Sequence, residues 1–238
     1  MRLFSLLTFI LCLYLSEASA QVIKKYKINP GEKIVEVIPA NETYSYYEFM
    51  PGKVYLKNNT VSLVQLNYNS VLGEMQFIDP KGDTLSLADE KMIKIIVVNN
   101  DTFYYDDVYL RLIDNEGKIK LANNQYCEIV NKEKIGEFGQ PGRGSIETFT
   151  TMSSNSSFSL KDLVVNEVIT IAKKSYYYIS DESNNYKVAN KKNLLEMFPK
   201  NEKEIKAYLK ENKVDFYNEK DMKKLVIFLK RIIPTMPL

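Results

Sequence analysis

Short runs of alternating apolar and polar residues, separated by turn sequences, extend from Val54 to Val130 and constrain the fold more than any other feature. In VSLVQLNY, for example, Val64, Leu66 and Tyr68 fall on one face of an extended strand. The intervening turns, such as DPKGD, are rich in Asp, Asn and Gly, which suit tight connections. Connections this short join antiparallel neighbours, because a parallel crossover needs about a dozen residues. The pattern predicts an antiparallel β meander that curls into a sandwich or half-barrel.

Two of these runs predict local detail. The segment LNYNSVLGEMQFI reads as a hairpin with its turn at 69–73, since Asn and Gly are typical of strand connections. A functional interpretation would instead place Tyr68, Asn69 and Glu74 at the mouth of a pocket. The run MIKIIVV is apolar enough to be covered on both faces, and we expect residues 93, 95 and 97 to point inward.

The hydrophobic period changes at Asn190, where the chain begins to read as helix. Asn190, Asn201 and Asn218 each precede a helical pattern and are N-cap candidates. Glu204, three residues after Asn201, is typical of a capping box. The α+β chain is therefore expected to end in a small helical unit, residues 190–238, packed on the β domain.

The N-terminus has the pattern of a secretory signal peptide. Arg2 precedes an apolar run over residues 3–15, and Ala-Ser-Ala at 18–20 suits signal peptidase. Residues 1–20 are expected to be removed, and the protein is expected to be exported to the periplasm or the cell surface. No later segment is apolar for long enough to span a bilayer.

Composition narrows the chemistry available to the chain. There is no histidine, which removes the commonest general base and most catalytic zinc sites. Cys127 is the single cysteine of the expected mature chain, so no internal disulfide can form. A net charge of +2 is too small to indicate a basic surface that binds nucleic acid. No phosphate-binding or dinucleotide-binding motif occurs, and no cofactor is expected.

Tyrosines on the expected strands are the strongest signal of surface recognition in the sequence. Tyr104 and Tyr105 form one cluster, and Tyr176 and Tyr178 belong to another. A tyrosine ring is apolar while its hydroxyl forms hydrogen bonds, so such residues suit a ligand or partner surface. The simpler interpretation is that they are half-buried strand residues. With Tyr68, these are the candidate binding residues on the strands.

A polar interval at about 136–159 interrupts the β domain, residues 21–189, and is rich in Gly, Ser and Thr. Loops this long are usually functional or disordered. Arg143 lies between glycines there and could meet an anion. A mobile solvent loop is the simpler interpretation.

The carboxylates Glu74, Asp79, Asp83, Asp106 and Asp107 are candidates for a catalytic pair or a calcium site. The calcium-loop spacing is absent, and DPKGD reads first as a turn. A carboxylate-dependent secreted hydrolase acting on glycan is therefore the alternative function.

Several segments resemble one family. They are GKVYLK, LNYN, EMQFI, FYYDDVYL and, most specifically, the stretch from KKNLLEMFP through EIKAYLKENK to KKLVIFL. Together they are similar to uncharacterised exported proteins of Bacteroidota bacteria, over most of the expected mature chain. The resemblance implies export and a β-then-α order, and implies no activity, cofactor or catalytic residue.

The preferred hypothesis is a non-catalytic binding or protein-interaction module, with an envelope protein or a glycan as its partner. The tyrosine-bearing sheet face and the 136–159 loop are the expected contact surface. A third hypothesis is an assembly protein whose edge strand pairs with a partner strand.

Overall fold

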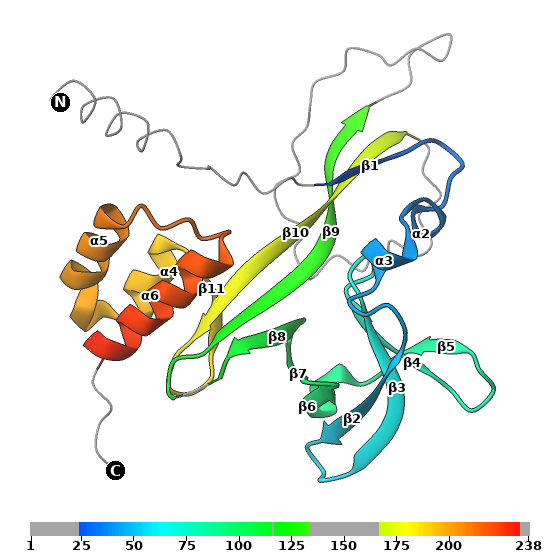
Figure 1. Cartoon of the computed structure of the whole chain (residues 1–238), viewed down its shortest axis with the longest axis horizontal. Helices are drawn as coiled ribbons and strands as arrows, with labels where there is room; N and C mark the ends of the chain where they lie inside the picture. The colour runs from blue at the N-terminus through cyan, green and yellow to red at the C-terminus, as the bar shows by residue number, and fades with distance from the viewer. Residues whose placement is uncertain (1–23, 116, 134–166, 234–238) are drawn as a thin grey trace, which may run out of the picture.

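The structure is a computed structural model that describes residues 24–115, 117–133 and 167–233. Within these residues eleven strands form one sheet in the order β1-β10-β9-β8-β7-β6-β2-β3-β4-β5, with β11 beside β10 (Figure 1). Every neighbouring pair is antiparallel. The predicted α+β class is confirmed. The expected signal peptide, the 136–159 loop and Arg143 lie outside the described residues.

The first part of the sheet curls around its own core. Its strands are β2 (Met50–Leu56), β3 (Val61–Asn69), β4 (Glu74–Ile78), β5 (Thr84–Ser86), β6 (Ile93–Val98), β7 (Asp101–Asp106) and β8 (Val108–Asp114), with a 3-10 turn, η2 (Glu90–Met92), before β6. Leu66, Met75, Ile96 and Phe103 from four of these strands pack together and are almost completely buried. This burial of apolar surface holds the curled strands closed.

The predicted hairpin at 69–73 is confirmed. Asn69 pairs with Glu74 across the strands, and the Asn69 side chain accepts hydrogen bonds from the backbone N–H of Val71 and Leu72, at 3.0 and 3.1 Å. Gly73 has a φ of +71°, which glycine adopts without steric penalty.

The prediction of which β6 residues point inward is wrong in part. Ile93, Ile96 and Val98 are buried, whereas residues 95 and 97 are only half-buried. A register irregularity against β2 lies between Tyr55 and Leu56, which pair with Ile95 and Ile93. The extra residue in β6, Lys94, shifts the alternation by one position, as a β-bulge does.

The longest strands cross the whole molecule. They are β9 (Leu121–Glu133) and β10 (Val168–Ser180), and Figure 1 shows them running from the helices to the far side of the curled strands. Along β10 lie β1 (Lys25–Ile28) and β11 (Tyr186–Val188). The short helix α2 (Ile34–Val37) packs on a second core at the far end of β9 and β10, and the short helix α3 (Ala40–Thr43) follows it in the chain.

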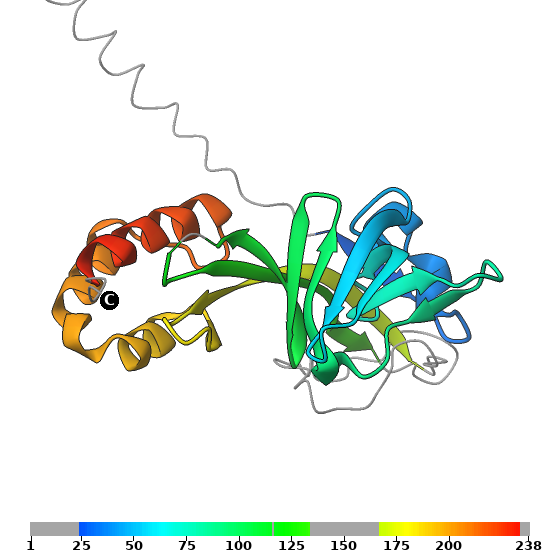
Figure 2. The same ribbon diagram turned by 90° about the horizontal axis from the view of Figure 1, so that it is seen from below.

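The C-terminal helices sit at one end of β9 and β10 (Figure 2). They are α4 (Lys191–Met197), α5 (Glu202–Glu211) and α6 (Glu219–Ile232), with a 3-10 turn, η5 (Pro199–Asn201), between the first two. Ile205, Met222 and Leu225 pack against Leu121 and Ile179 of the sheet. The helical unit and the sheet therefore share a core.

Two of the three predicted N-caps are confirmed. The Asn190 side chain accepts a hydrogen bond from Asn193 N–H, and that of Asn218 accepts from Lys220 and Asp221 N–H. Asn201 makes no cap hydrogen bond, so the capping-box prediction is wrong. Its side-chain amide instead donates to the Ile232 carbonyl at 3.2 Å, because the end of α6 packs beside it.

Candidate functional site

Strand alternation places three of the predicted tyrosines on one face of the sheet. Tyr178 pairs with Ala122 of β9, which pairs with Leu112 of β8. Leu110 lies two residues before Leu112 on β8, and it pairs with Tyr104 of β7. Directly paired residues project to the same face, as do residues two apart on one strand. Tyr104, Tyr176 and Tyr178 therefore share a face, which also carries Tyr126 and Tyr186. We call these five residues and Tyr217 the tyrosine face.

One half of the tyrosine face is a group of three rings. Tyr126 and Tyr176 stack with centroids 5.3 Å apart and an interplanar angle of 14°. Tyr217, from the loop between α5 and α6, meets Tyr176 edge-on at 5.9 Å. Tyr217 is 58% exposed, which leaves most of this ring open to a partner.

A buried carboxylate fixes the stacked pair. Glu128 is buried and forms an ion pair with Lys174. It also accepts a hydrogen bond from the Tyr176 hydroxyl at 3.2 Å. Burial, followed by the neighbouring Tyr176 and Glu128, raises the pKa of Tyr126. Burial also raises the pKa of Tyr176, so the Tyr126 and Tyr176 phenols are neutral at pH 7 and serve as hydrogen-bonding groups.

The other half of the tyrosine face lies over β7 and β11. The rings of Tyr104 and Tyr186 are 6.3 Å apart, and the Lys120 ammonium lies 5.8 Å from the Tyr104 centroid. The Tyr186 hydroxyl is buried and has no hydrogen-bond partner within the described part of the chain. Burial raises the pKa of Tyr186, and the charges of Tyr104 and Asp106 add to this.

The remaining predicted site residues lie elsewhere. Tyr68 is 3% exposed and packs against Phe103 and Tyr109. Its hydroxyl accepts a hydrogen bond from the Asn124 amide at 3.2 Å, so its place in a pocket mouth is wrong. Tyr105 points to the opposite face from Tyr104, as alternation requires, and meets Tyr109 at 5.0 Å.

Three members of the tyrosine face escaped sequence reasoning. Tyr126 and Tyr186 are single tyrosines within polar segments, so they did not stand out as clusters. Alternation along NNQYCEIV could have found Tyr126 once its pairing with β10 was known. Tyr217 lies between two helices, and no pattern in the sequence brings it to the sheet.

The structure places the predicted carboxylates in separate turns and strands rather than in one site. One Asp79 oxygen accepts hydrogen bonds from the backbone N–H of Lys81 and Asp83, both at 2.8 Å, so this segment is the expected turn. Asp106 and Asp107 end the β7 strand and begin the connection to β8. Among the described residues no group of three or more acidic, histidine or cysteine side chains could hold a metal ion.

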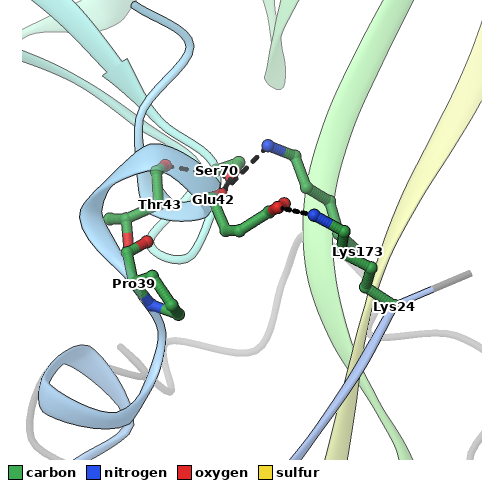
Figure 3. A network of polar contacts seen from close by, with 6 residues as sticks. All are labelled: Lys24, Pro39, Glu42, Thr43, Ser70 and Lys173. Atoms are coloured by element: carbon green, nitrogen blue, oxygen red, sulfur yellow. Dashed lines mark hydrogen bonds and ion pairs between the residues drawn. The ribbon is translucent and has the colours of Figure 1, made fainter. Parts of the chain in front are cut away.

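A polar network ties α3 to β10 (Figure 3). The Lys173 ammonium and the Ser70 hydroxyl both donate to the Glu42 carbonyl at 3.0 Å, and Lys24 forms an ion pair with the Glu42 carboxylate. Burial lowers the pKa of Lys173. Burial also raises the pKa of its cross-strand neighbour Cys127 to about 11. The thiol is protonated at neutral pH and is therefore a poor nucleophile.

None of the helices that the structure describes has the length and apolar character of a membrane-spanning segment. Comparison with protein-family models, with curated proteins and with solved structures finds no match.

Proposed function

We propose that this chain is an exported, non-catalytic interaction module whose tyrosine face docks a protein of the cell envelope. The observation that carries the proposal is the gathering of six tyrosines from β7, β9, β10, β11 and the α5–α6 loop on one face. Tyrosine is enriched at the energetic centres of protein interfaces, because it combines a large apolar ring with a hydrogen-bonding group.

The geometry supports a preorganised surface. Tyr176 contacts both Tyr126 and Tyr217, and its hydroxyl donates a hydrogen bond to Glu128. Side chains that are already ordered lose less conformational entropy when a partner binds.

Export belongs to the same proposal. It is supported by the signal-peptide pattern of residues 1–20 and by the resemblance to exported Bacteroidota proteins. Mass spectrometry of the protein recovered from its native host tests it directly. The expected result is a chain that begins at Gln21, and an intact Met1 in an intracellular fraction would contradict export.

The partner is tested with the mature chain, residues 21–238, immobilised and exposed to native envelope extract. A captured protein is then purified, and its affinity is measured for wild type and for a double variant, Tyr176→Ala with Tyr217→Ala. Loss of two interface anchors is expected to weaken binding at least about tenfold.

Two matched controls lie outside the tyrosine face. Tyr105→Ala tests a tyrosine adjacent in sequence but on the opposite face, and Tyr47→Ala tests a ring that is 100% exposed. Both are expected to bind as wild type, with circular dichroism confirming that each variant is folded. Unchanged affinity in the Tyr176 and Tyr217 double variant would contradict the proposal. Binding of an envelope glycan in place of a protein would change the proposed partner from a protein to a glycan.

One observation favours the alternative, a secreted hydrolase acting on glycan. Burial, followed by the neighbouring Asp107 charge, raises the pKa of Asp106 beside the tyrosine face. A glycosidase uses one carboxyl group with a raised pKa together with a second carboxylate across the same cleft, and Asp106 is the candidate for the first of these. Hydrolysis of envelope glycan by wild type but not by Asp106→Asn would support it.

A further inference from the structure

The strand β10 has two short partners along the edge that faces away from β9 (Figure 1). β1 pairs with residues 169–172 of β10, and β11 pairs with residues 178–180. Next to β11, the Ala189 N–H donates to the Tyr177 carbonyl at 2.7 Å. Within the described part of the chain, no strand pairs with this edge of β10 at residues 173–176. We call the outer side of residues 173–176 the open edge.

The open edge presents backbone groups that a further strand can bind. The Tyr177 carbonyl points toward β11, whereas the Ser180 N–H points the other way and donates to the Lys120 carbonyl at 3.1 Å. Backbone groups of successive residues alternate between the two edges of a strand, so the N–H and the carbonyl of Ser175 point away from β9. Neither β1 nor β11 extends as far as Ser175. Unpaired backbone groups on a sheet edge are a template for another strand.

The register of β1 identifies the segment that leads into the open edge. Lys25 pairs with Ala172 in an antiparallel ladder, so the preceding residue, Lys24, falls opposite Lys173. The Lys24 ammonium forms an ion pair with the Glu42 carboxylate, and the Lys173 ammonium donates to the Glu42 carbonyl at 3.0 Å (Figure 3). Directly opposed residues project to the same face of a sheet. The shared contact with Glu42 therefore agrees with a register that continues one residue before β1.

We propose that residues 21–24, at the start of the mature chain, extend β1 and cover the open edge of β10. The same register places Val22 opposite Ser175 and Gln21 opposite Tyr176. Val22 and Ser175 then exchange two backbone hydrogen bonds, as alternate pairs of an antiparallel ladder do. Because Tyr176 belongs to the tyrosine face, the new N-terminus borders that face.

The open edge ends where the expected mature chain begins. Tyr177 follows the open edge, and its carbonyl already accepts the Ala189 N–H. An added strand can therefore pair no further than residue 176, which is the position opposite Gln21. Cleavage after Ala20 makes Gln21 the first residue, so the proposal rests on the export proposed above.

A strand of a partner protein is the competing occupant of the open edge. Residues 21–24 are joined directly to β1, which is already paired with β10. A segment held beside its site in this way has a high effective concentration and loses little freedom when it pairs. Connection to β1 thus favours this chain's own terminus over a separate molecule.

Amide hydrogen exchange tests the pairing. The mature chain, prepared to begin at Gln21 and labelled with nitrogen-15, is compared by NMR with a chain that begins at Lys24. The Ser175 N–H is expected to exchange at least about fivefold more slowly in the longer chain. The Lys174 N–H, which alternation directs to β9, is the internal reference for folding and stays protected in both. Equal exchange of Ser175 in the two chains would overturn the proposal.

Two proline variants of the mature chain test the register. Val22→Pro removes the N–H that bonds to the Ser175 carbonyl and puts the proline ring against that carbonyl. In Ile23→Pro the lost N–H points to the outer side, where an edge strand tolerates proline. Protection of Ser175 is expected to be lost in Val22→Pro and kept in Ile23→Pro. The reverse result, or protection kept in both variants, would overturn the assigned register.

These measurements separate the strand extension from export. The chains are made to begin at chosen residues, so the exchange result does not depend on whether the host removes residues 1–20. The mass spectrometry described above decides export independently.

Discussion

At the scale of single residues, the buried phenols differ in whether their hydroxyls are paired. The Tyr44 hydroxyl donates to the Gln76 amide oxygen at 3.0 Å, whereas the buried Tyr186 hydroxyl has no partner among the described residues. A paired hydroxyl contributes modestly to stability, and an unpaired buried one is unfavourable. The two tyrosines therefore form a matched pair for mutation.

We expect Tyr186→Phe to leave the free energy of unfolding unchanged or to raise it by about 1 kcal/mol. Tyr44→Phe is expected to lower it by about 1 kcal/mol, because the Gln76 oxygen loses one of its two donors and keeps only the Asn69 amide. Urea unfolding followed by circular dichroism measures both. A larger loss for Tyr186→Phe than for Tyr44→Phe would mean that the Tyr186 hydroxyl has a partner in solution.

Cys127 makes stability depend on pH. Burial raises the pKa of its thiol from 9.0 to about 11 in the folded chain. The unfolded chain therefore releases this proton first as pH rises, which favours unfolding. The contribution is fully present below about pH 9 and is lost between about pH 9 and pH 11.

The Cys127→Ala variant isolates this effect from the titration of the tyrosines. The difference in unfolding free energy between wild type and Cys127→Ala is expected to shrink by about 2 kcal/mol from pH 8.5 to pH 10.5. Urea titrations at several pH values measure it. A difference that stays constant over this range would show that the folded thiol has an ordinary pKa.

At the scale of elements, the helices depend on capping and the sheet depends on register. Asn218 accepts two backbone hydrogen bonds at the start of α6, whereas Asn201 looks equivalent in sequence but binds the end of α6. In β6, one extra residue reverses the alternation after Ile93. Both differences come from contacts with distant segments rather than from local sequence.

Asn218→Ala is expected to lower the unfolding free energy by about 1 kcal/mol, because two N–H groups of the first helical turn lose their acceptor. Asn218→Asp keeps an acceptor at the same position and is expected to remain within about 0.5 kcal/mol of wild type. Thermal and urea unfolding measure both variants. Equal loss in the two would mean that capping is not the reason.

At the scale of the whole molecule, β9 and β10 connect the curled strands to the helical unit (Figure 2). Leu225 of α6 is completely buried in the core that the helices share with Leu121 and Ile179. Because a shared core couples the two parts, we expect them to unfold together. Ile227, on the same helix, is 65% exposed.

Leu225→Ala is expected to lower the unfolding free energy by about 2–5 kcal/mol. The far-ultraviolet helix signal and the near-ultraviolet tyrosine signal should then be lost at the same urea concentration. Ile227→Ala, the matched control, is expected to change stability by less than about 0.5 kcal/mol. Separate midpoints for the two signals would show that the helical unit unfolds independently.

Local sequence determined the strand pattern from Val54 to Val130, the C-terminal helices, the hairpin at 69–73, and the caps at Asn190 and Asn218, because each depends on residues close together in the chain. Only the tertiary structure decided the phase of β6, the role of Asn201 and the grouping of the tyrosines. Alternation alone sends Tyr104 and Tyr105 to opposite faces, but only the pairing of β7, β8, β9 and β10 decides which of the two shares a face with Tyr176 and Tyr178. Register between distant strands sets which side chains meet, and the pattern of any one strand leaves that register open.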